Sequence, residues 1–230
     1  MDMREFVKTL RTGRLSVDEI GRGMHKSFIN ARELIEDAET LLDKRPGRAI
    51  SLAVLAIEEI GKVVLLANAA VRAAKAPVEW KVIQEELDLR SHQHKQTIFA
   101  AYGRTLLNDL ASGKGKPSFY DNEVPGGIAP LLDLFKQLGF YVDAGNARFT
   151  CPDEFGRDNR EWAEWLIRVA KERTESFEAL HGTEDKSISV ARRAAEFAAV
   201  VAQARDEADL KIRIREFLTK QRREFQGHGT

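Results

Sequence analysis

The sequence has a single cysteine and no uninterrupted apolar run long enough to cross a membrane. One thiol, Cys151, cannot form an intrachain disulfide, which favours a reducing compartment such as the cytoplasm. A membrane-spanning helix needs about 18 apolar residues, and charges interrupt the richest stretch, 52–70. The first residues also lack the continuous apolar core of a signal peptide. We therefore expect a cytoplasmic protein with no membrane partner.

The chain also lacks net charge of either sign and lacks a phosphate-binding loop. Lys and Arg together number 36, as do Asp and Glu, so no overall charge attracts nucleic acid, and any basic face is local. The segment "GKGKPS" at 113–118 does not have the P-loop spacing, which is Gly, four residues and then Gly-Lys-Ser/Thr. No cofactor is expected. A content of 43% hydrophobic and 31% charged residues is typical of a folded, helix-rich protein.

Apolar residues recur at three- and four-residue steps along most of the chain, which predicts an all-α bundle of antiparallel helices. We expect one domain over 16–226, a tail or short helix over 1–15, an exposed loop at about 111–128 and a C-terminal tail at 227–230. A small β-hairpin is expected near 139–151, with a turn at 144–146. The expected helices cover residues 16–43, 48–74, 78–110, 128–140, 159–180, 187–205 and 207–225.

The helix expected over 48–74 carries charged residues in the middle of an apolar stretch. Glu58 and Glu59 precede Lys62 by four and three residues, so either carboxylate can reach its ammonium group on one helix face. The apolar flanks leave little solvent face, so at least one carboxylate should be partly desolvated. Gly61 costs about 1 kcal/mol relative to alanine in a helix interior. Close approach of another helix is the simplest reason for this glycine.

A second polar cluster, "LRSHQHKQ", lies in the helix expected over 78–110 and contains Arg90, His92, His94 and Lys95. Lys62 lies fifteen residues before Pro77, and His92 lies fifteen residues after it. If the two helices pack antiparallel, equal arms bring Lys62 and His92 to the same height. The sequence therefore predicts one buried network that contains a carboxylate, an imidazole and an ammonium group.

Three interpretations of this network are open from the residues alone. It could be a structural ion network that fixes the register of two helices. It could be an acid–base site, because an imidazole beside a carboxylate and cations can act on a phosphodiester. Glu59, His92 and His94 could also bind a metal, but their spacing matches no zinc pattern such as H-E-x-x-H. We expect no metal.

Several segments, taken in order, resemble the AbiV abortive infection proteins of bacteria, within the broader HEPN-like helical group. They are "NARELIEDAETLL" (30–42), "AISLAVLAIEEIGKVVLL" (49–66), "RSHQHKQ" (90–96), "FYVD" (140–143) and "CPDEF" (151–155). The resemblance implies a HEPN-like bundle and a role in phage defence, in which an infected cell stops its own growth. Many HEPN-like proteins are metal-independent endoribonucleases that cut RNA with an R-x(4–6)-H motif, often at a dimer interface. The resemblance therefore also implies a homodimer, with RNA as a candidate partner.

The site residues implied by the resemblance do not follow that general motif. After Arg90 the histidines come two and four positions later, and the fifth position is Lys95. The AbiV patterns fit better, because His92 and Lys95 match H-x-x-K, and Glu58, Glu59 and Lys62 match E-E-x-G-K. In the catalytic interpretation, an imidazole exchanges the proton and a cation stabilises the phosphorane. A carboxylate orients either the cation or the imidazole. The candidates are His92 for the proton, Lys62, Lys95 or Arg90 for the phosphorane, and Glu58 or Glu59 for orientation.

Two functions from different classes follow. The first is a defence effector that acts on RNA or translation and is a candidate metal-independent endoribonuclease. The second is a non-enzymatic defence protein that binds a phage-encoded or host protein, with a purely structural network. Tyr141 and Asp143 match the family segment but also suit a packed aromatic and a turn. We expect His181, near a helix end, to be solvated, and the basic helix over 207–225 to pack on the bundle or to face RNA.

Overall fold

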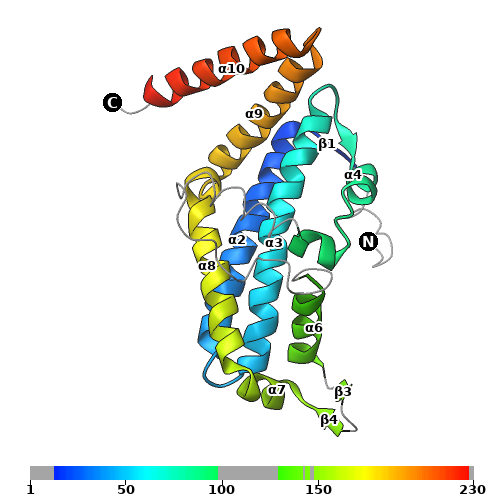
Figure 1. The fold of residues 1–230 in the computed structure, drawn as a ribbon, viewed down its shortest axis with the longest axis vertical. Helices are drawn as coiled ribbons and strands as arrows, with labels where there is room; N and C mark the ends of the chain where they lie inside the picture. Colours follow the sequence, from blue (N-terminus) through cyan, green and yellow to red (C-terminus); the bar gives the residue numbers. More distant parts are fainter. Residues whose placement is uncertain (1–12, 98–128, 142, 146–147, 228–230) are drawn as a thin grey trace, which may run out of the picture.

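The computed structural model describes residues 13–97, 129–141, 143–145 and 148–227. The predicted all-α fold is confirmed for these residues. Residues 92–97 form a short helix that has no label in Figure 1. The helices are α2 (Val17–Leu41), α3 (Pro46–Ala73), α4 (Trp80–Glu86), α6 (Ala129–Phe140), α7 (Pro152–Asp158), α8 (Arg160–His181), α9 (Glu184–Ala202) and α10 (Glu207–Gly227).

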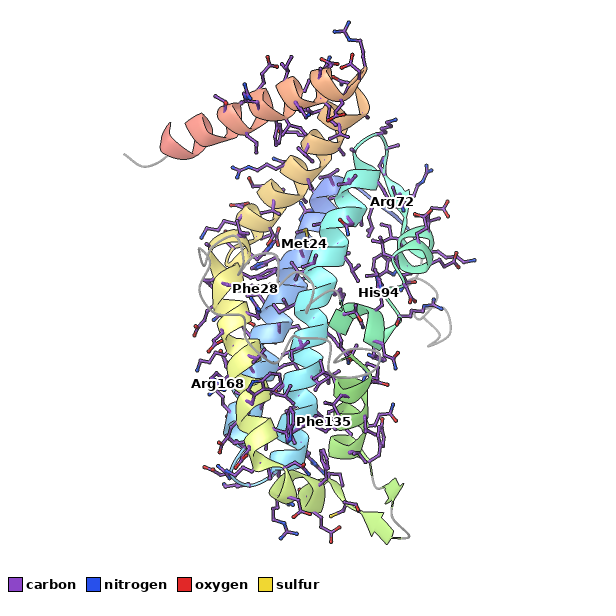
Figure 2. All side chains as sticks on the ribbon, in the orientation of Figure 1. Met24, Phe28, Arg72, His94, Phe135 and Arg168 are labelled. Carbon is purple, nitrogen blue, oxygen red and sulfur yellow. The ribbon has the colours of Figure 1, made fainter. Side chains whose placement is uncertain are left out.

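Helix α3 is the central element of the bundle. It packs antiparallel to α2 and also contacts α6, α7, α8 and α9, whereas α10 packs on α9 and projects away from the other helices (Figure 1). The apolar spacing of the sequence explains the packing, because the residues that repeat at helical steps on α2 face the core. Met24 and Phe28, for example, are at most 1% exposed (Figure 2).

Two small antiparallel strand pairs complete the fold. β3 (Asp143–Gly145) pairs with β4 (Arg148–Thr150), which confirms the predicted hairpin. The turn predicted at 144–146 is wrong for its first two residues, which lie in β3. β1 (Arg14–Leu15) pairs with β2 (Val78–Glu79), so the end of the segment expected to be a tail or short helix is a strand instead. This pairing ties the start of α2 to the connection that follows α3.

The single helix expected over 78–110 is wrong. Helix α4 ends at Glu86, residues 87–90 form a turn, and a new helix begins at His92. Asp88 adopts a left-handed conformation with φ of 46°, which aspartate tolerates better than most residues. The Ser91 hydroxyl accepts a hydrogen bond from the His94 amide at 3.1 Å and so caps the new helix. Residues 98–110 and the predicted loop at 111–128 lie outside the described residues.

The junction of α8 and α9 buries a histidine, so the expectation that His181 is solvated is wrong. Its residue is 3% exposed, and its Nδ1 lies 3.0 Å from the Ser187 hydroxyl. The ring stacks on Phe177 with centroids 5.5 Å apart. Burial, with a smaller contribution from the charge of His25, lowers the pKa of His181 from 6.5 to about 4. The folded protein therefore holds this imidazole in its neutral form.

We expect His181 to make stability fall as the pH falls from about 6.5 to about 4. In that window the unfolded chain binds a proton at this position and the folded chain does not, so the stabilisation present above pH 6.5 is lost. The full loss is about 3 kcal/mol. Urea unfolding at pH 7 and pH 4.5 measures it, with His181→Asn expected to reduce the difference between the two values. An equal difference in the wild type and the variant would show that another group causes it.

Candidate active site

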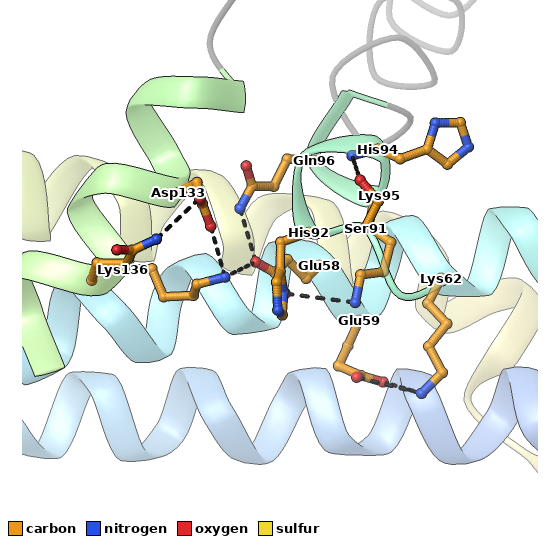
Figure 3. A network of polar contacts seen from close by, with 11 residues as sticks. Glu58, Glu59, Lys62, Ser91, His92, His94, Lys95, Gln96, Asp133 and Lys136 are labelled. Carbon is orange, nitrogen blue, oxygen red and sulfur yellow. Dashed lines mark hydrogen bonds and ion pairs between the residues drawn. The ribbon is translucent and has the colours of Figure 1, made fainter. Parts of the chain in front are cut away.

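A single carboxylate, that of Glu58 on α3, contacts side chains from the second polar cluster and from α6. Its residue is 2% exposed. Its Oε1 accepts hydrogen bonds from Gln96 Nε2 at 2.8 Å and Lys136 Nζ at 2.9 Å. Its Oε2 lies 2.5 Å from His92 Nδ1 and 3.7 Å from Lys95 Nζ (Figure 3). The predicted network of carboxylate, imidazole and ammonium therefore exists and is centred on Glu58.

The buried charges of this network balance one another. Lys95 and Lys136 are 8% and 9% exposed, and Gln96 is fully buried. Lys136 also pairs with Asp133 of α6, whose Oδ1 lies 3.0 Å from Nζ. Two carboxylates thus face two ammonium groups, and such a matched set can be buried where one unpaired charge could not.

Gly61 determines how closely the helix of residues 92–97 approaches α3. A Cβ atom at Gly61 would lie 2.2 Å from the carbonyl oxygen of Lys95, far inside van der Waals contact. The predicted reason for this glycine, close approach of another helix, is confirmed. Because Glu58 lies about one helical turn before Gly61, this approach brings His92, Lys95 and Gln96 onto the same carboxylate.

His92 is the member of the network that reaches solvent, with 51% of its side chain exposed. An ionised carboxylate can only accept a hydrogen bond, so His92 donates through Nδ1. Among the described residues the other ring nitrogen, Nε2, has no hydrogen-bond partner, so it can take or give a proton. A buried carboxylate that fixes the orientation and tautomer of an exposed imidazole is the arrangement that a general base requires.

The network falls inside the region that a known family covers. A family model described as AbiV, of the HEPN group, matches residues 19–175, which is more than half of the chain and contains Glu58, residues 92–96 and Lys136. The chain belongs to the AbiV family. Membership indicates a HEPN-like fold and a role in abortive infection, a form of phage defence. No curated protein and no solved structure gives a significant match. Within the described ranges, no helix combines the length and hydrophobicity needed to cross a membrane.

The E-E-x-G-K string of this AbiV-family chain divides between two faces of α3. Lys62 Nζ pairs with Glu59 Oε2 at 3.1 Å, on the side that faces α2, while Glu58 binds His92 (Figure 3). The prediction that Lys62 meets His92 is therefore wrong by one turn. The prediction counted fifteen residues on either side of Pro77 and assumed a continuous helix after it, but the connection contains β2, the short α4 and a turn.

Arg90 and the hairpin residues of the AbiV segment lie outside the network. The guanidinium of Arg90 is exposed, and its nearest described partner is Gln84 Oε1 at 3.5 Å. Tyr141 is 67% exposed next to Phe140, whose ring centroid lies 6.4 Å away. Asp143 is the first residue of β3. No described contact links these residues to Glu58.

Three members of the network were missed by the sequence reasoning: Gln96, Asp133 and Lys136. A signal existed for two of them, because Asp133 and Lys136 are three residues apart in a mainly apolar helix, the same kind of spacing that drew attention to Glu59 and Lys62. Gln96 lies inside the "RSHQHKQ" segment, where an uncharged amide gives no such signal.

The described residues do not assemble the metal-binding alternative. Glu59 pairs with Lys62, and the His94 ring points away from the network (Figure 3). In the part of the chain that the structure describes, no three His, Cys, Asp or Glu side chains lie close enough together to hold a metal ion.

Proposed function

We propose that this AbiV-family protein is an abortive-infection effector that cleaves single-stranded RNA with His92 as its acid–base group. The observation that supports this most is the 2.5 Å contact between Glu58 and His92 Nδ1, combined with the half-exposed side chain of His92. A buried carboxylate and an exposed imidazole nitrogen are what proton transfer to or from a bound substrate needs. No cofactor is required for this chemistry.

The proposed reaction is an internal transfer of the phosphodiester. His92 Nε2 accepts the proton of a ribose 2′-hydroxyl, and the 2′-oxygen forms a bond to the neighbouring phosphorus. The bond from phosphorus to the 5′-oxygen breaks, and that oxygen leaves with a proton supplied by the imidazolium or by water. The products are a 2′,3′-cyclic phosphate and a 5′-hydroxyl, so no oxidant or metal enters the balance.

The exposure of each cation decides whether it can contact the substrate or only its neighbours in the site. Lys95 is 8% exposed and 3.7 Å from Glu58, so it acts on the position of Glu58 and on the local potential rather than on a phosphate directly. Arg90 is exposed and two residues before His92, which suits it to pair with the negative phosphorane.

Expression in bacteria tests the assignment. Wild-type protein should arrest growth and degrade cellular RNA, and His92→Ala should do neither, because the proton acceptor is gone. His94→Ala is the matched control, since it removes a neighbouring imidazole that points away from Glu58 (Figure 3), and it should behave as the wild type. If His92→Ala and Lys95→Ala both arrest growth and degrade RNA as the wild type does, the site is assigned wrongly.

A second candidate is a non-enzymatic defence protein that binds a phage-encoded or host protein. It is favoured by the burial of Glu58, Lys95 and Lys136, which suits a network that holds helices together. Purified protein that leaves all RNA intact but binds a phage-encoded or host protein would support this candidate over the first.

We also propose that the protein is a homodimer that pairs through helix α10, which we call the C-terminal arm. None of residues 207–220 is buried, although the arm carries apolar residues at helical spacing. Leu210, Ile214 and Leu218 are four residues apart, so two antiparallel copies centred on Ile214 would place Leu210 against Leu218. Light scattering at micromolar concentration should give a dimer for the wild type and a monomer for Leu218→Glu. A wild-type monomer would contradict the proposal.

A further inference from the structure

A groove along the seam between α2 and α3 is left unexplained by the site at His92. Its volume is about 530 Å³, and it is formed largely by the faces of the two helices. It contains the Glu59–Lys62 pair, which is the part of the E-E-x-G-K string that does not touch Glu58. Glu59 and Lys62 can therefore have a role that is separate from the one of Glu58 at His92.

The groove is polar at one end and apolar at the other. Gly23 of α2 faces Leu66 of α3, so in this antiparallel pair Lys62 lies near the level of Lys26 and Glu59 near that of Asn30. Leu66 comes one turn farther along α3. The Glu59–Lys62 pair is thus at the end nearer to Glu58, and the end toward the start of α2 is apolar apart from Glu19.

The charges of the polar end leave room for an anion. Lys62 is already paired with Glu59 at 3.1 Å. The other acidic group of the groove, Glu19, lies at the opposite end, where its carboxylate accepts hydrogen bonds from the amide of Ser16 at 2.8 Å and from its hydroxyl at 3.0 Å. Lys26 is exposed and forms no ion pair within the described residues. An incoming phosphate would meet this ammonium group and, next to it, Lys62.

The apolar end suits a flat ring. Trp80 and Leu15 are half-buried there, and Leu66 is 3% exposed at its floor. Stacking of a base on an aromatic side chain does not depend on which base it is, and it contributes substantially to binding of single strands. A phosphate next to an aromatic platform is the combination that binds a nucleotide.

The position of the groove connects it to the proposed reaction. Lys62 follows Glu58 by four residues, which is about one turn or ~6 Å along α3. The groove therefore begins within about one turn of the carboxylate that holds His92. This proximity supports a single strand that contacts both places.

We propose that this groove binds the nucleotide next to the scissile phosphate of single-stranded RNA, with the phosphate at Lys26 and Lys62 and the base against Trp80. The proposal rests on the proposed function, because it supplies the substrate contact for cleavage at His92. It assigns the residues of E-E-x-G-K two tasks, with Glu58 orienting the imidazole and Lys62 binding the substrate.

Binding and cleavage measured separately test the groove. The binding probe is a fluorescein-labelled 2′-O-methyl RNA decamer, which lacks the attacking hydroxyl and cannot be cleaved. Lys26→Gln and Lys62→Gln should each weaken binding about tenfold, flatten its salt dependence and raise KM for cleavable RNA with little change in kcat. Trp80→Leu should weaken binding, and Trp80→Phe, which keeps a ring, should largely preserve it. Lys171→Gln is the control and should bind as the wild type, because Lys171 is on α8, pairs with Glu39 and does not line the groove.

The outcomes separate the groove from the catalytic assignment. His92→Ala should bind the uncleavable probe as tightly as the wild type while failing to cleave. If the Lys26, Lys62 and Trp80 variants bind and cleave as the wild type while His92→Ala is inactive, the groove proposal is overturned and the proposed function stands. If wild-type protein cleaves no RNA but the groove variants still lose binding of the probe, the groove is supported as an RNA site and the catalytic assignment fails.

Discussion

Replacement of Gly61 by alanine is expected to destabilise the protein by about 3 kcal/mol, although the same change stabilises most helices. The new Cβ would lie 2.2 Å from the carbonyl oxygen of Lys95. That oxygen belongs to the backbone, so no rotamer change can relieve the clash, and the helix of residues 92–97 must move off α3. Such a shift also pulls His92 and Gln96 away from Glu58. Urea unfolding at pH 7 measures the effect.

Gly23→Ala is the matched control for this prediction. A Cβ at Gly23 would lie 3.5 Å from Leu66 Cδ1, which is an ordinary contact. Alanine at that position on α2 should therefore stabilise the protein by up to about 1 kcal/mol. If Gly61→Ala and Gly23→Ala both stabilise the fold, α3 and the helix of residues 92–97 do not approach as closely as the structure has them.

Removal of the Glu58 charge should be the most costly single change in the network. Glu58→Gln leaves the buried ammonium groups of Lys95 and Lys136 without the carboxylate that they share, and breaking such a buried set costs about 3–5 kcal/mol. Glu59→Gln should cost less than about 1 kcal/mol, because its partner Lys62 is 31% exposed and can be solvated. Chemical unfolding at pH 7 compares the two variants.

The difference between neighbouring carboxylates is what makes this comparison informative. A glutamine at position 58 or 59 has the same shape and the same helix propensity, so only the surroundings differ. Equal stabilities for the two variants would mean that Glu58 does not hold the buried charges together. Combined replacement of Glu58, Lys95 and Lys136 by methionine should recover part of the stability lost by Glu58→Gln, because it removes the uncompensated charges.

The periodicity of the sequence was sufficient to predict most helices, because an amphipathic stripe on a helix reports burial directly. It failed between 87 and 91, where the apolar spacing continues but the chain turns. No Gly or Pro marks that turn. It depends on the left-handed Asp88 and on the cap at Ser91. Asp and Ser favour turns and caps but also occur on exposed helix faces, so neither residue alone marks a break.

The site was predicted in composition but not in detail. Spacing places Glu58, Glu59 and Lys62 within reach of one another, yet which carboxylate faces His92 depends on the rotation of α3 and on the path of the connection after it. Gly61 was the informative residue, since its cost required a close neighbour. Lys136 comes from a helix 78 residues away from Glu58. Contacts of that separation follow from tertiary packing, which local patterns do not encode.

Cleavage of a defined single-stranded RNA by purified protein, in which the wild type is compared with His92→Ala and His94→Ala, tests the central claim most directly. The account predicts that the wild type cleaves and leaves 2′,3′-cyclic phosphate ends, that His94→Ala matches it, and that His92→Ala is slower by about 10²-fold or more. His92→Ala should melt within a few degrees of the wild type, because its side chain is 51% exposed. Wild-type protein that leaves the RNA intact, or folded His92→Ala that cleaves at the wild-type rate, would contradict the account.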